Sequence, residues 1–93
     1  MNNVERMVEQ NRRQAILALL TFAAAQTMSA RELRTELENV HGQVVTVDRV
    51  RSDLIWMADV GVVRVLQGGD AASITERGKE IVLGRAALPG GAA

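Results

Sequence analysis

One face of a predicted helix in the middle of the chain carries side chains suited to binding a partner. Within residues 46–60, four polar or aromatic residues share that face: Arg49, Ser52, Asp53 and Trp56. The opposite face is apolar because five residues recur at helical spacing, namely Val47, Val50, Leu54, Met57 and Ala58. A tryptophan that points away from the core side is the least expected of these placements. The helix is therefore predicted to present ionic, hydrogen-bonding and aromatic groups to a partner.

Hydroxyl and imidazole groups do not form a catalytic set in this sequence. Ser29 is a predicted helix cap, Ser73 lies in a predicted strand, and His41 is the only histidine, with no evident carboxylate or nucleophile partner. Gly68 and Gly69 connect two predicted strands instead of opening a helix, so they do not make a phosphate-binding loop. The chain has no cysteine, which excludes disulfides and thiolate metal sites and fits a reducing compartment. We expect neither an enzyme nor a metal or cofactor site.

The composition indicates one small domain, residues 1–93, without excess charge. Eleven basic and eleven acidic side chains cancel. Non-specific affinity for DNA comes mainly from neutralising phosphates, so this balance argues against a strong DNA binder. With Trp56 and Phe22 as the only aromatic residues, the core is expected to be aliphatic and helix-rich.

The most apolar run covers residues 15–25. Eleven residues are too few to span a bilayer, which takes about 20. Arg12 and Arg13 before the run resemble the start of a secretory signal, but Glu5 and Glu9 in the same region argue against one. We expect a buried helix in a cytoplasmic protein that does not enter a membrane.

The first helix is predicted to run from about Val4 to Ala25, with residues 1–10 prone to fraying, and it carries two apolar stripes. The denser stripe is assigned to the core: Ile16, Leu19, Leu20 and Ala23. The second has Asn11 at its centre and includes Val8, Ala15, Ala18 and Phe22. It either packs against neighbouring elements or forms the interface of a homodimer, in which the small alanines permit close approach and the asparagine sets the register.

The next two helices have clear start and stop signals. Ser29 and Glu32 form a capping box at the start of the second helix, and Gly42 is placed to end it. Thr46 is a good N-cap for the third helix. Gly61 can end that helix in the left-handed conformation, with Val62 folding back onto it.

The rest of the chain is predicted to form a β-hairpin and a last helix. Residues 62–67 and 72–75 read as strands around a Gly-Gly-Asp turn. Thr75 caps the final helix, and Gly78 permits close packing on it. Residues 88–93 are expected to be a flexible tail. The order predicts an α+β, mostly helical domain with a three-helix core, a two-stranded β-hairpin wing and a C-terminal helix.

Several motifs in this order resemble the winged helix-turn-helix fold. They are M-S-A-R-E-L-R-T-E-L, V-R-S-D-L-I-W-M-A-D-V-G-V-V and G-G-D-A-A-S-I-T-E-R-G-K-E-I. Together with R-R-Q-A-I-L-A-L-L and I-T-E-R-G-K-E-I-V-L-G-R-A-A-L-P-G, they are similar to a family of small Mu-like prophage proteins. This resemblance spans residues 11–90.

The resemblance implies that the third helix enters the major groove of double-stranded DNA and that the wing meets an adjacent groove or the backbone. It makes Arg49, Ser52 and Asp53 the base-facing candidates, with Arg49 able to pair with guanine. Arg51 is implied as a phosphate contact. Two arginines of the second helix are implied as backbone contacts: Arg31 and Arg34.

The wing departs from a DNA-binding pattern. Its turn, Gly68, Gly69 and Asp70, contains no lysine or arginine, and Asp70 would be repelled by phosphate. We expect a sequence-specific DNA-binding accessory protein or transcription regulator of phage origin. The alternative is a protein-docking module that uses Trp56 and the first helix and binds no DNA.

Overall fold

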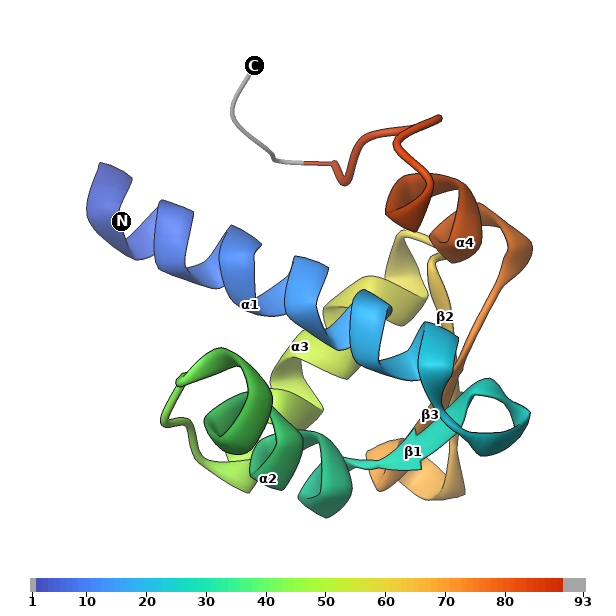
Figure 1. Cartoon of the computed structure of the whole chain (residues 1–93), viewed down its shortest axis with the longest axis horizontal. Helices are drawn as coiled ribbons and strands as arrows, with labels where there is room; N and C mark the ends of the chain where they lie inside the picture. Colours follow the sequence, from blue (N-terminus) through green and yellow to red (C-terminus); the bar gives the residue numbers. More distant parts are fainter. Residues whose placement is uncertain (1, 90–93) are drawn as a thin grey trace.

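The computed structural model describes residues 2–89 as a mostly helical α+β fold (Figure 1). The elements in chain order are α1 (Asn3–Phe22), the short 3-10 turn η1 (Ala24–Gln26), β1 (Thr27–Ser29), α2 (Ala30–His41), α3 (Val47–Asp59), β2 (Val63–Leu66), the turn η2 (Gln67–Gly69), β3 (Ala71–Ile74) and α4 (Glu76–Val82). The predicted order of helices and hairpin is therefore confirmed.

A single aliphatic core joins the helices to the sheet. Its fully buried members come from α1, α2, α3 and the start of the hairpin, and the largest are Ile16, Leu17, Leu20, Leu33, Leu37, Leu54 and Met57. The inward face of α3 is the predicted one, because Val50, Leu54 and Met57 are completely buried. Burial of this apolar surface is the main term that stabilises so small a domain.

Helix ends follow the predicted local signals. The Thr46 side chain accepts a hydrogen bond from the Arg49 backbone N–H at 3.1 Å, and Ser29 and Glu32 form a complete capping box. After α3, Gly61 has a φ of 83°, and the Val62 N–H donates to the Met57 carbonyl oxygen at 3.0 Å. These contacts satisfy backbone groups that a helix end leaves without intrahelical partners.

The sheet has three antiparallel strands, in the order β1-β3-β2. The expected two-stranded hairpin is present as β2 and β3, but the prediction of two strands was wrong because β1 pairs along the free edge of β3. Pairing of Met28 with Ala72 exemplifies the register. The third strand gives β3 hydrogen-bond partners on both sides, so only β1 and β2 remain as edges.

Helix α1 ends three residues earlier than predicted. Ala25 and Gln26 adopt left-handed φ values of 54°, which a continuing α-helix does not allow. This turn reverses the chain so that β1 can reach β3 (Figure 1). The strand pairing gained there replaces the helical hydrogen bonds that residues 23–25 would have made.

Both chain ends differ in part from expectation. At the N-terminus, helix α1 already begins at Asn3, with the Asn2 side chain accepting from the Glu5 N–H. Fraying of residues 1–10 stays a prediction, and residue 1 lies outside the described part. Residues 88–93 were predicted to form a flexible tail. That prediction is wrong at Leu88, which is 3% exposed and belongs to the core cluster. Residues 90–93 lie outside the described residues.

None of the helices between residues 2 and 89 combines the length and the apolar character that crossing a membrane requires.

We predict that Gly78→Ala destabilises the fold. A Cβ atom on Gly78 would overlap the Val62 carbonyl oxygen and lie 2.7 Å from the Ile74 Cγ1 atom. Overpacking of this kind typically costs about 1–3 kcal/mol. The free energy of unfolding from urea titration measures the effect. Arg77→Ala, an exposed change on the same helix, is the control and should stay within about 0.5 kcal/mol of the parent. Equal stability of the two variants would contradict the packing argument.

Candidate recognition surface around α3

Asp53 lies on the inner side of α3 and does not face outward. It is 2% exposed, and it accepts hydrogen bonds from the side chain of Arg12 on α1, through Nε and through Nη2 at 3.1 Å. Arg13 Nε donates to the same carboxylate at 3.2 Å. The predicted role of Asp53 as a base-facing residue is therefore wrong. A carboxylate buried among apolar groups must be paired, and both arginines come from a helix forty residues away in sequence.

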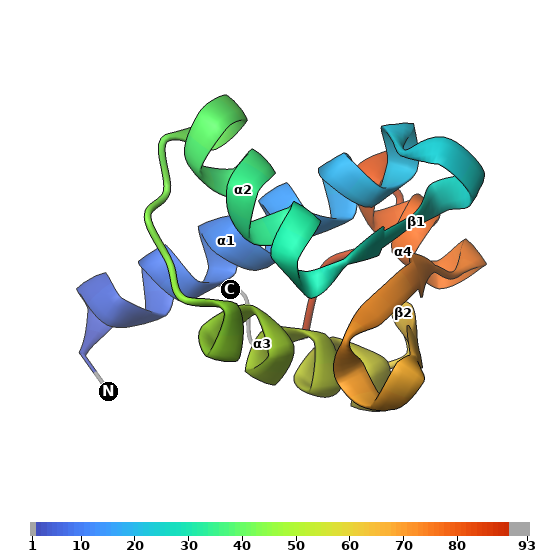
Figure 2. The same cartoon turned by 90° about the horizontal axis from the view of Figure 1, so that it is seen from below.

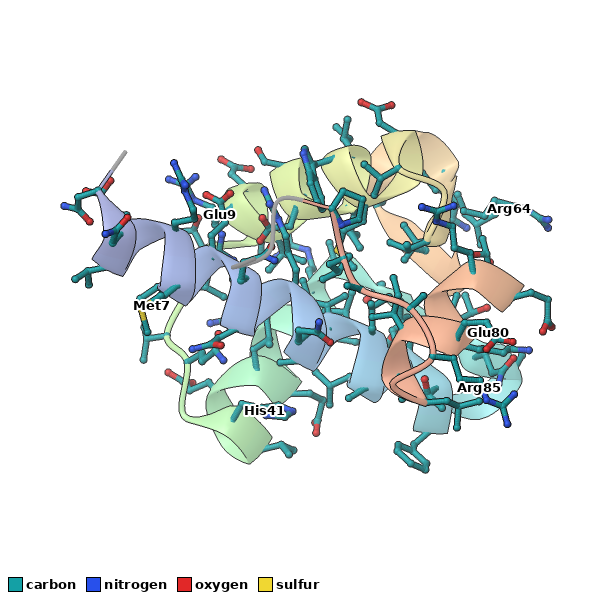
Figure 3. The ribbon with its side chains drawn as sticks, turned by 90° about the horizontal axis from the view of Figure 1, so that it is seen from above. Met7, Glu9, His41, Arg64, Glu80 and Arg85 are labelled. Carbon is teal, nitrogen blue, oxygen red and sulfur yellow. The ribbon has the colours of Figure 1, made fainter. Side chains whose placement is uncertain are left out.

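Trp56 belongs to the same cluster. The guanidinium carbon of Arg13 lies 3.9 Å from the centroid of the Trp56 ring, a cation–π distance. Arg13 also bonds Glu9 at 2.9 Å, and Figure 3 shows Glu9 on the side of α1 that faces α3. The indole is half-buried and packs against the hydrophobic core. The structure thus shows Trp56 packed against a neighbouring helix, although periodicity places it on the outer face.

The outer face of α3 is small and of mixed character. Arg49 and Ser52 are exposed, as the sequence predicts, and they share this face with Asp48, Ile55 and Asp59. Ile55 is 52% exposed, which is high for a large aliphatic side chain. The exposed face therefore combines one basic residue with two acidic residues and one apolar residue.

Arg51 connects α3 to the turn of the β-hairpin. Its Nε and Nη2 atoms each lie 2.9 Å from the carboxylate of Asp70, and its Nη1 atom lies 3.1 Å from Asp48. Figure 2 shows this turn beside α3. The charge of Arg51, predicted to contact phosphate, is thus shared with two carboxylates, while the wing turn is held next to the helix.

The two arginines of α2 have different surroundings. Arg31 lines an open groove of about 850 Å³ whose walls come from α1, α2 and the η1–β1 segment, and α3 contributes no residue to it. Arg34 is half-buried and does not line that groove. The structure therefore does not bring Arg31 onto the surface that holds Arg49.

The predicted interface residues on α1 are divided by the fold. Val8 is 52% exposed and Phe22 is 87% exposed, whereas Ala15 is buried in the core and Ala18 is half-buried in the wall of the α1–α2 groove. The prediction of one continuous dimer interface along this stripe is wrong at Ala15, because α1 lies against α2 and the core there. Two exposed apolar patches remain, one at each end of α1.

The groove has one residue with a perturbed acidity. Glu32 lies in the lining of the groove. Its pKa is held below the ordinary value of 4.5, mainly by the hydrogen bond from the Ser29 backbone N–H and to a smaller extent by the Ser29 hydroxyl. Because folding lowers this pKa, the ionised capping box stabilises α2 above about pH 4.5 and loses that contribution as the pH falls further. Glu32 is thus engaged in capping the start of α2 and is not a free acid.

Across residues 2–89, no three histidine, aspartate or glutamate side chains come together in a way that could hold a metal ion. His41 lies at one end of the groove, on the last turn of α2.

The sequence did not predict the ion pair between Arg12 and Asp53, and the reason can be identified. The helical spacing of the apolar residues places Asp53 outside the apolar face, and periodicity alone does not reveal a partner on another helix. A signal was present in the two consecutive arginines, Arg12 and Arg13, which directly precede the most apolar run of the chain and need polar partners once they are buried with it.

Comparisons of the chain with protein-family models, with curated proteins and with solved structures find no match.

We predict that Asp53→Ala destabilises the protein by about 3–5 kcal/mol, because it leaves the buried Arg12 without its carboxylate. Asp59→Ala, an exposed change on the same helix, is the matched control and should have little effect. The free energy of unfolding from urea titration measures both.

A double variant separates the lost charge pair from the lost packing. Replacing both partners, in Arg12→Met with Asp53→Leu, should recover most of the stability lost in Asp53→Ala, since an apolar pair replaces the buried ion pair and Arg13 keeps its bond to Glu9. If Arg12→Met with Asp53→Leu were as unstable as Asp53→Ala, the electrostatic explanation would be wrong.

Proposed function

We propose that the chain is a winged helix-turn-helix protein that offers α3 to the major groove of duplex DNA, as a DNA-binding accessory protein or transcription regulator of phage origin in the cytoplasm. The order of helix, short strand, two helices and β-hairpin supports this assignment. So does the resemblance of α2, α3 and the hairpin to winged-helix regulators and to a small Mu-like prophage family.

The observation that carries the proposal is the exposed pair Arg49 and Ser52 on the N-terminal half of α3. They lie three residues apart, so they share one helix face, and neither is buried. The N-terminal residues of a recognition helix are those that reach base edges in this class of protein. Arg51 and Asp70 hold the hairpin turn beside the same helix.

The chemistry available to this face is limited to a few contacts. Arg49 can donate two hydrogen bonds to guanine, and Ser52 can bond a base or a phosphate. Arg51 can reach phosphate only by exchanging its bonds to Asp48 and Asp70. With so few cations engaged, binding by one copy is expected to be weak and to depend only shallowly on salt concentration.

One specific observation favours protein docking as a second candidate. Ile55 is 52% exposed on the outer face of α3, between Ser52 and the acidic Asp59. An apolar residue flanked by carboxylates is more typical of a surface that meets protein than of one that meets phosphate.

We predict that Arg49→Ala weakens binding to a duplex selected from a random-sequence library by about 1–3 kcal/mol. The reason is the loss of a bidentate contact to a base. Fluorescence anisotropy at about 50 mM and about 200 mM salt measures the affinity. Arg77→Ala removes the same charge from α4 and is the control. Absence of binding to every duplex at low salt would end the DNA proposal.

We further predict that Asp70→Asn tightens DNA binding. It removes a negative charge from the hairpin turn and releases Arg51 from one of its two carboxylate partners. The same anisotropy titration measures the change, and Glu80→Gln, which removes a carboxylate on α4, is the control. A weaker complex with Asp70→Asn would show that the Arg51–Asp70 bond is needed in the bound state.

A further inference from the structure

Helix α1 exposes large apolar side chains at both of its ends. Val4 is 68% exposed, Met7 61% and Val8 52% at the N-terminal end, and Phe22 is 87% exposed at the C-terminal end. Figures 1 and 2 show the N-terminal turns of α1 extending beyond the other elements. In Figure 3, Met7 projects from these turns on the side opposite Glu9. Solvent exposure of several such residues on one helix indicates a surface that a partner covers.

The C-terminal half of α1 forms one wall of the open groove with α2 and β1. Its apolar lining comes from α1, β1 and the end of α2, and it includes Ala18, Leu19, Phe22, Met28 and Val40. The lining therefore accommodates the apolar stripe of another helix, in the way that grooves between helices receive amphipathic helices.

Apolar residues of α1 lie opposite one another when two copies of the helix run antiparallel. Placing Val4 of one copy beside Phe22 of the other also places Val8 beside Ala18 and Asn11 beside Ala15. In the same register, Met7 meets Leu19. Each large exposed side chain of the N-terminal half therefore meets the groove half of the other copy, and the small Ala18 in the groove wall allows the backbones to approach. Ala15 remains in the core of its own copy.

Charges agree with this register. Glu5 follows Val4, and Arg31 lines the end of the groove near Phe22, since α2 begins just after the turn that follows α1. The antiparallel arrangement directs Glu5 of each copy toward Arg31 of the other, so that unlike charges meet twice across a two-fold axis. In this register the two-fold axis crosses α1 at residue 13, midway between Asn11, which is exposed, and Ala15.

We propose that the occupant of the α1–α2 groove is a second copy of this chain, held by an antiparallel α1–α1 contact. The interface is isologous and closed, because the same face supplies both the projecting side chains and the groove that receives them. It covers the four most exposed apolar residues of α1. Val4 and Val8 also border a hollow that Arg49 of α3 lines, so the contact lies beside the N-terminal half of α3. Dimerisation is measured without DNA, so the proposal does not depend on whether DNA is the ligand of α3.

Engineered cysteines test the register directly, because the chain has no cysteine of its own. The antiparallel contact predicts that Val4→Cys mixed with Phe22→Cys forms a heterodimeric disulfide under mild oxidation. Val4→Cys alone should not cross-link, since the two Val4 positions lie about 27 Å apart along the helices, far beyond disulfide reach. Efficient cross-linking of Val4→Cys alone would indicate a parallel dimer and overturn the proposal.

Sedimentation analysis of the full chain measures the dimerisation itself. Val8→Asp and Phe22→Asp should each weaken the dimer about tenfold or more, because a charge replaces a buried apolar side chain. Ile55→Asp is the matched control, because Ile55 has the same 52% exposure as Val8 but lies on α3. Circular dichroism confirms that each variant is folded. A parent chain that stays monomeric up to about 1 mM would overturn the proposal.

Discussion

The buried ion pair between Arg12 and Asp53 determines which face α3 presents to solvent. A carboxylate at 2% exposure must keep its partners, and both of its arginine partners belong to α1. Rotating α3 about its axis would pull Asp53 away from them while exposing Val50 and Leu54. Burial of apolar side chains and pairing of Asp53 therefore both fix the rotation of α3 about its axis. Together they determine which residues of α3 face the solvent.

Arg13 extends this constraint to the aromatic residue of the helix. Its guanidinium is held by Glu9 and Asp53 and covers the Trp56 ring. The tryptophan that periodicity places on the outside is thus removed from the binding face by a long side chain of another helix. Without it, the candidate recognition surface consists of Arg49, Ser52 and Ile55 with two aspartates nearby. Basic and acidic side chains nearly balance on this surface, as they do over the whole chain. The surface can therefore make few contacts with phosphate groups.

Local signals predicted the elements well, and long-range contacts account for the differences. Thr46, the Ser29–Glu32 box and Gly61 act within one helical turn, so the sequence alone was sufficient to place these three helix ends. Strand β1 is only three residues long and exists because β3 lies beside it, so its sequence carries no independent strand pattern. The partner of Asp53 is also set by tertiary packing. The site was therefore half predictable: Arg49 and Ser52 were placed outside from periodicity, whereas Asp53 and Trp56 required the packed helices.

The hairpin turn has an unusual number of attachments for a loop. Besides its bonds to Arg51, Asp70 uses its backbone carbonyl oxygen to accept the N–H of Ala30, the first residue of α2, at 2.8 Å. Hairpin tips are normally where a domain tolerates added residues. Here an insertion between β2 and β3 would detach the start of α2 and one side of α3 at once. The connection at residues 42–46, with no helix or strand of its own, is the better place for the chain to lengthen without disturbing its neighbours.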